Sequence, residues 1–143
     1  MTILKRWALG VCAFILAGSA WSQAVTVADV KYEPTQTLGD STVQLNGAGV
    51  RYKAVFKVYT AGLYLEKKAS TPQEVASQRG PKRLSITMLR EIDSTELGKL
   101  FSRGMEDNMD RAAFSRIVPG VLRMSQIFSD HKKLQAGDQF MID

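Results

Sequence analysis

The chain has 143 residues, of which 45% are hydrophobic and 23% charged, and its formal net charge is +5. This length fits one domain and is too short for two domains of ordinary size. The hydrophobic content excludes a disordered chain, and a single cysteine excludes a small fold framed by disulfides.

The first 24 residues have the pattern of a cleavable export signal. Lys5 and Arg6 form a short positive region, an apolar run covers residues 7–17, and Ser22-Gln23-Ala24 offers small residues for cleavage. The apolar run is too short to span a bilayer, which takes about 20 residues. We therefore expect residues 1–24 to be a signal peptide, residues 25–143 to form the mature domain, and the protein to be periplasmic in a bacterium. An uncleaved anchor is the alternative.

Removal of the signal changes the composition of the chain. The net charge falls to +3, Cys12 and both tryptophans are lost, and His131 is the one histidine that remains. A zinc, haem or Ser-His-Asp site is therefore not expected, and we predict no metal and no cofactor. The basic residues are scattered, so we expect no nucleic-acid partner and, after cleavage, no stable membrane insertion.

Five segments have the residue types of strands. The first, Val25–Tyr32, is expected to open the sheet. Ser41–Tyr52 alternates in polarity, Val55–Leu65 is rich in β-branched and aromatic residues, Lys82–Arg90 follows, and Gln139–Ile142 ends the chain. The last segment either docks beside an earlier strand or is the start of a part that this sequence lacks, and we favour the second.

Three helices are predicted between these strands. Thr71-Pro72-Gln73-Glu74 is a capping box that predicts a short helix over 72–77. Asp93-Ser94-Thr95-Glu96 predicts the start of a second helix, and Asp110 is expected to cap a third from Arg111. Pro119-Gly120 is expected to break or kink this third helix, because proline lacks the N–H. Strands, then helices, then a strand indicate an α+β fold, with helices on one face of a mainly antiparallel sheet.

Two strand segments resemble the chalcone isomerase superfamily. Leu45-Asn46-Gly47-Ala48-Gly49-Val50-Arg51 is similar to its G-x-G-x-R strand, and Phe56–Leu65 and Leu84–Met88 look like the strands that follow. The pattern resembles especially the bacterial, exported, chalcone isomerase-like proteins, over about 25–143. The resemblance implies an open-faced β-sandwich with a ligand cleft between sheet and helices. Members of the family continue past this point, so we expect the domain to be truncated at its C-terminus.

The resemblance also implies roles for particular residues. Arg51 matches the arginine that anchors the substrate in the plant enzymes and the carboxylate in fatty-acid-binding relatives. Thr60 matches a threonine that helps to polarise a carbonyl. Leu97 stands where the enzymes have a catalytic tyrosine, and leucine cannot donate a hydrogen bond. Tyr64 shares a strand face with Thr60 and is the third ligand-binding candidate, whereas Tyr59 faces the other way and is taken as solvated or helix-flanking.

Strand parity supports a role for Arg51. In a regular strand, Arg51 shares a face with Val43 and Leu45, where a guanidinium is costly unless it is paired with an anion. The anion is either a ligand or an internal partner such as Glu91 or Asp93. A bulge at Gly47 or Gly49 would instead turn Arg51 to solvent.

We therefore expect a non-catalytic binding protein for a small amphipathic carboxylate such as a fatty acid. One alternative is an intramolecular lyase of the chalcone isomerase type, with Arg51 and Thr60 acting on one substrate. Another is a structural or assembly protein whose cleft is filled by its own side chains. The oligomeric state is open.

Overall fold

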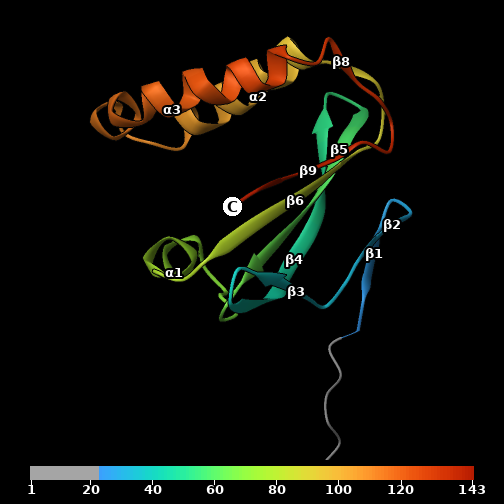
Figure 1. Ribbon diagram of the computed structural model, residues 1–143, viewed down its shortest axis with the longest axis vertical. Coiled ribbons are helices and arrows are strands. Elements are labelled where there is room, and N and C mark those ends of the chain that lie inside the picture. The colour runs from blue at the N-terminus through green and yellow to red at the C-terminus, as the bar shows by residue number, and fades with distance from the viewer. Residues whose placement is uncertain (1–22) are drawn as a thin grey trace, which may run out of the picture.

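A computed structural model describes residues 23–143, so the predicted signal segment up to Ser22 lies outside the described residues. A five-stranded antiparallel sheet is the centre of the fold (Figure 1). Its strands in spatial order are β3 (Thr35–Leu38), β4 (Ser41–Lys53), β5 (Phe56–Leu65), β6 (Lys82–Met88) and β9 (Gln139–Ile142). The last segment of the chain thus docks antiparallel beside β6.

The N-terminal segment forms a separate hairpin instead of the first strand of the sheet. Its strands are β1 (Val25–Val27) and β2 (Val30–Tyr32), which pair only with each other. The turn residues Ala28 and Asp29 both have left-handed φ angles, 46° and 65°. Two such residues in succession reverse the chain, as in a primed two-residue turn. The prediction of one strand over 25–32 that opens the sheet is therefore wrong.

The three helices begin at the predicted residues. They are α1 (Pro72–Ser77), α2 (Ser94–Asp107) and α3 (Arg111–Ser129). Thr71, Asp93 and Asp110 cap them, each accepting backbone N–H groups of the first turn. Helices α2 and α3 lie side by side in a layer across one end of the sheet (Figure 1). A short pair of strands, β7 (Ile92–Asp93) and β8 (Lys133–Leu134), holds the segment that enters α2 beside the segment that leaves α3.

Helix α3 runs without interruption through Pro119, so of the predicted break or kink the break is wrong. Proline cannot donate to the carbonyl of Ser115, one turn earlier. Ser115, Pro119 and Gly120 are all exposed, so water can reach that carbonyl and the helix can continue. No helix within residues 23–143 has the length and apolar character needed to cross a bilayer.

A bulge in β4 changes which side chains share a face of the sheet. Leu45 lies opposite Tyr64, but the next paired residue is Gly47, opposite Leu63, so that Asn46 has no partner on β5. The extra residue reverses the alternation. The Asn46 side chain is used elsewhere, because its Oδ1 accepts the backbone N–H of Ala69 at 2.7 Å.

The prediction from strand parity, that Arg51 shares a face with Val43 and Leu45, is therefore wrong. Arg51 lies opposite Tyr59, whereas Leu45 lies opposite Tyr64. The sheet therefore has two different sides. One side packs on the β1–β2 hairpin through a buried cluster of Tyr32, Val43, Leu45 and Tyr64. The other side packs on the helices through a buried cluster of Val58, Ile86, Met88 and Leu97.

Gly62 provides a test of the hairpin side. A Cβ atom at Gly62 would lie 2.5 Å from Cδ1 of the Tyr32 ring, which is itself buried. We predict that Gly62→Ala lowers the free energy of unfolding by about 1–3 kcal/mol, because a packed ring has to move. Gly49→Ala is the matched control, since nothing lies within 4 Å of its Cβ position. Urea unfolding measures both variants, and equal effects would contradict the packing described.

Candidate functional site

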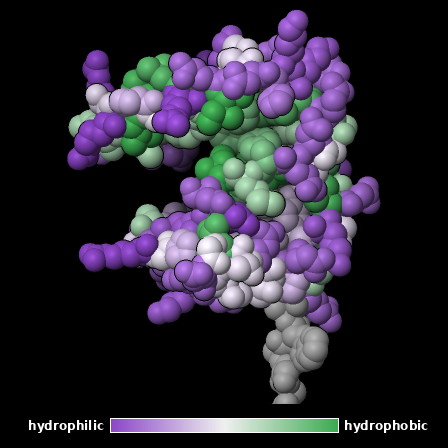
Figure 2. Space-filling view, in the orientation of Figure 1, coloured by the Kyte–Doolittle hydropathy of each residue, from purple (hydrophilic) through white to green (hydrophobic). Residues whose placement is uncertain are grey.

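A groove opens between the sheet and the end of α2. Arg51 and Tyr59 form its sheet side, and its volume is about 550 Å³. The helix side is formed by Leu100, Phe101, Gly104, Met105, Asp107, Asn108 and Met109. Figure 2 shows that the molecule is hollowed between the helical layer and the sheet, with hydrophobic side chains at the back of the hollow. We call the set of residues named here the Arg51 groove.

Arg51 and Tyr59 are brought together by strand register. They are cross-strand partners on β4 and β5, on the side of the sheet that faces the helices. The Tyr59 ring stacks on Phe101 of α2, with 6.0 Å between the ring centroids. This contact is expected to fix the ring in the wall of the groove.

The Tyr59 phenol keeps its proton at neutral pH. Burial raises the pKa of Tyr59 above its ordinary value, and the nearby charge of Arg51 lowers this pKa by a smaller amount. A protonated phenol next to a guanidinium presents hydrogen-bond donors of two kinds to one point in the groove.

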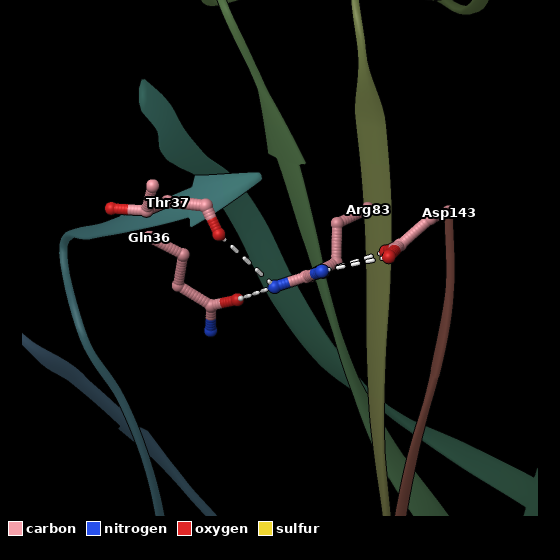
Figure 3. Close-up of polar contacts among 4 residues, drawn as sticks. All are labelled: Gln36, Thr37, Arg83 and Asp143. Carbon is pink, nitrogen blue, oxygen red and sulfur yellow. Dashed lines mark hydrogen bonds and ion pairs between the residues drawn. The ribbon is translucent and has the colours of Figure 1, made fainter. Parts of the chain in front are cut away.

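The acids expected as internal partners of Arg51 are engaged elsewhere. Glu91 forms an ion pair with Lys133, and Asp93 caps α2. Within residues 23–143, no hydrogen bond or ion pair joins the Arg51 guanidinium to another side chain. Arg83 gives the contrast: its guanidinium holds Asp143 with two bonds, at 2.6 and 2.7 Å, and also reaches Gln36 and Thr37 (Figure 3).

Thr60 and Tyr64 lie on the opposite side of the sheet from Arg51. Thr60 is completely buried, and its Oγ1 accepts the hydroxyl of Tyr32 at 2.7 Å. Tyr64 is also completely buried and donates to the backbone oxygen of Glu33 at 3.0 Å. The three predicted ligand-binding residues are therefore not brought together. The β1–β2 hairpin covers the side of the sheet on which Thr60 and Tyr64 lie, so no space for a ligand is left beside them.

A second groove, which sequence reasoning missed, lies between α3 and β9. Its volume is about 470 Å³. Most of its lining is apolar, from Met124, Ile127, Phe128, Leu134, Phe140, Met141 and Ile142, with His131 and Gln139 beside them. An aromatic cluster separates it from the Arg51 groove: Phe101 packs on Phe128 and Phe140, with centroids 5.9 and 6.2 Å away.

Leu97 is completely buried in the core on the helix side, so it belongs to packing and does not line the Arg51 groove. In the part of the chain that the structure describes, no three metal-ligating side chains come together. What the Arg51 groove can offer a ligand is thus one free guanidinium, one phenol and an apolar wall from α2, with the polar side chains of Asp107 and Asn108 exposed at its rim.

Comparison with known proteins identifies the class of protein. The chain matches the chalcone isomerase-like family over residues 24–143, and it belongs to that family. A fatty-acid binding protein of Arabidopsis thaliana has a similar structure, with a TM-score of 0.57 and 15% sequence identity over 84% of this chain and 72% of that one. This likeness confirms the α+β, open-faced chalcone isomerase-like fold. Comparison with curated protein sequences found no match.

The ionisation of Tyr59 tests the geometry of the pair. We predict that Tyr59 titrates above the ordinary tyrosine pKa, and that Arg51→Gln raises its pKa further, because the positive charge that favours the phenolate is lost. Carbon-13 NMR of labelled tyrosine ring carbons, assigned with Tyr59→Phe, measures this. Lys67→Gln, an exposed cation after the far end of β5, is the control. A Tyr59 pKa unchanged by Arg51→Gln would contradict the arrangement.

Proposed function

We propose that this protein binds a small amphipathic carboxylate, such as a fatty acid, in the Arg51 groove. The observation that carries the proposal is the exposed Arg51 guanidinium, which has no ionic partner among the described residues and lies across from Tyr59 at the edge of a groove with one apolar wall. A guanidinium binds a carboxylate through two parallel hydrogen bonds, which a single surface lysine cannot do.

The groove suits both ends of such a ligand. The carboxylate would lie between Arg51 and Tyr59, and the alkyl chain would run along Leu100, Phe101 and Met105. Each methylene taken out of water contributes about 0.8 kcal/mol, so an apolar wall of this kind supplies affinity while the polar pair supplies orientation. Asp107 is the one carboxylate of the groove, and it is exposed at the rim.

Two further considerations support this proposal. The structurally similar plant protein is a fatty-acid binding protein, and methionines such as Met105 and Met109 adapt to flexible chains. From the predicted signal over residues 1–24, we also propose that the mature protein holds its ligand in the periplasm of a bacterium.

The lyase alternative needs Arg51 and Thr60 on one substrate. These residues lie on opposite sides of the sheet, and Tyr32 already bonds to the Thr60 hydroxyl. The geometry thus favours binding over ring closure. The alternative of a structural protein with a filled cleft agrees with the side of the sheet that carries Thr60, where the β1–β2 hairpin packs. The side that faces the helices has an open groove.

Binding of dodecanoate, measured by isothermal titration calorimetry, tests the proposal. We predict that Arg51→Gln weakens binding by about 10–100-fold, since a charge-assisted hydrogen bond contributes roughly 1.5–3 kcal/mol. Tyr59→Phe should weaken it by about 2–10-fold, as loss of one neutral hydrogen bond does. Lys67→Gln is the control and should bind as the unchanged chain does.

Dodecanol separates the head-group contact from the apolar wall. We expect the alcohol to bind the unchanged chain and Arg51→Gln equally, because it has no carboxylate for the guanidinium. Absence of dodecanoate binding, or equal binding by Arg51→Gln, would overturn the proposal.

A further inference from the structure

The tip of the β4–β5 hairpin carries an unusual set of exposed side chains. Val55 is 83% exposed, Phe56 57% and Tyr52 50%, and all three lie within five consecutive residues. The seven residues from Arg51 to Lys57 include three cations and no acid. Exposed apolar side chains scattered singly are normal, but a cluster of them within a rim of one charge marks a contact surface.

The hairpin geometry arranges these side chains around the tip. Lys53 and Phe56 are cross-strand partners on one face, and Tyr52 and Lys57 are partners on the other. Each face therefore has one ring and one ammonium, and Val55 lies between them in the turn. The turn residue Ala54 has a left-handed φ of 52°, a conformation that a residue with a Cβ adopts at a cost. This strained conformation is part of the tight turn in which Val55 is exposed.

The surface around the tip is positively charged, because the acidic residues near it are engaged in other contacts. Glu96 is the ion-pair partner of Lys53, Glu91 pairs with Lys133, and Asp93 is bonded to the first turn of α2. Arg90 lies over the Phe56 ring, with its Cζ 4.8 Å from the ring centroid. Within residues 23–143, Lys57 and Arg90 have no acidic partner, so two cations face solvent beside the exposed rings.

We propose that this tip, Tyr52–Lys57 together with Arg90, docks on the surface of an anionic phospholipid bilayer. Apolar and aromatic side chains enter the boundary between head groups and acyl chains, while the ammonium and guanidinium groups stay among the phosphates. Three apolar side chains at the tip of one hairpin are far too small an area for a stable protein interface, which buries more than about 1,000 Å² in total. A bilayer needs only a shallow apolar insertion with cations around it. This docking does not depend on a ligand in the Arg51 groove, which begins at the neighbouring residue.

A fluorescent probe at the tip tests the proposal in the full chain. Val55→Cys in a Cys12→Ser background carries one environment-sensitive fluorophore, and Leu122→Cys in the same background is the matched control, since Leu122 is 61% exposed on α3. We expect vesicles of phosphatidylglycerol, but not of phosphatidylcholine, to shift the emission of the probe at 55 towards that of an apolar environment. The probe at 122 should not shift. Binding through residues 1–24 alone would leave both probes in water, so a shift confined to residue 55 reports docking of the tip.

The cations are tested separately. We expect Lys57→Gln and Arg90→Gln each to weaken the apparent vesicle affinity by about fivefold, as one basic residue near an anionic surface contributes roughly that factor. Lys67→Gln should change it by less than twofold, and added salt should weaken binding of every variant. No emission shift of the probe at 55, or equal shifts at 55 and 122, would overturn the proposal. Equal losses of vesicle affinity in Lys57→Gln and Lys67→Gln would also overturn it. So would an emission shift that depends on protein concentration in the absence of vesicles, which would mean self-association. Because no fatty acid is added, failure here leaves the dodecanoate experiment unaffected.

Discussion

The single extra residue at Asn46 decides the chemistry of both sides of the sheet. Without it, Arg51 would share a face with Leu45 and point towards the β1–β2 hairpin. With it, Arg51 lies opposite Tyr59 on the side that faces the helices. The hydrogen bond from the Ala69 N–H to Asn46 is the local interaction that favours this arrangement, because it gives the unpaired residue a partner outside the strand ladder.

The two sides that result have different roles. On the hairpin side, Tyr32 packs on Gly62 and its hydroxyl bonds to Thr60, so that the polar groups are satisfied within the protein. On the helix side, an aromatic cluster holds α2 and α3 to the sheet: Tyr59 stacks on Phe101, which packs on Phe128. The same cluster forms the wall of the Arg51 groove. Stability of the helix layer and shape of the candidate site therefore depend on the same rings.

The position of the groove also relates it to the hairpin tip. Arg51 lines the groove, and the exposed set of residues begins at Tyr52, the next residue of β4. The second register shift leaves Val58 of β5 unpaired, between Tyr59, the partner of Arg51, and Lys57, the partner of Tyr52.

Local signals determined much of this protein from sequence alone. The caps at Thr71, Asp93 and Asp110 specified where the helices begin, because a side-chain acceptor must lie next to the free N–H groups of a first turn. The G-x-G-x-R strand indicated the family and singled out Arg51. Only the tertiary structure decided which face Arg51 occupies and that Tyr59, not Thr60, is its neighbour. The reason is that one extra residue reverses every later side chain in a strand, and the contact with Ala69 that favours that residue is made by a segment distant in sequence.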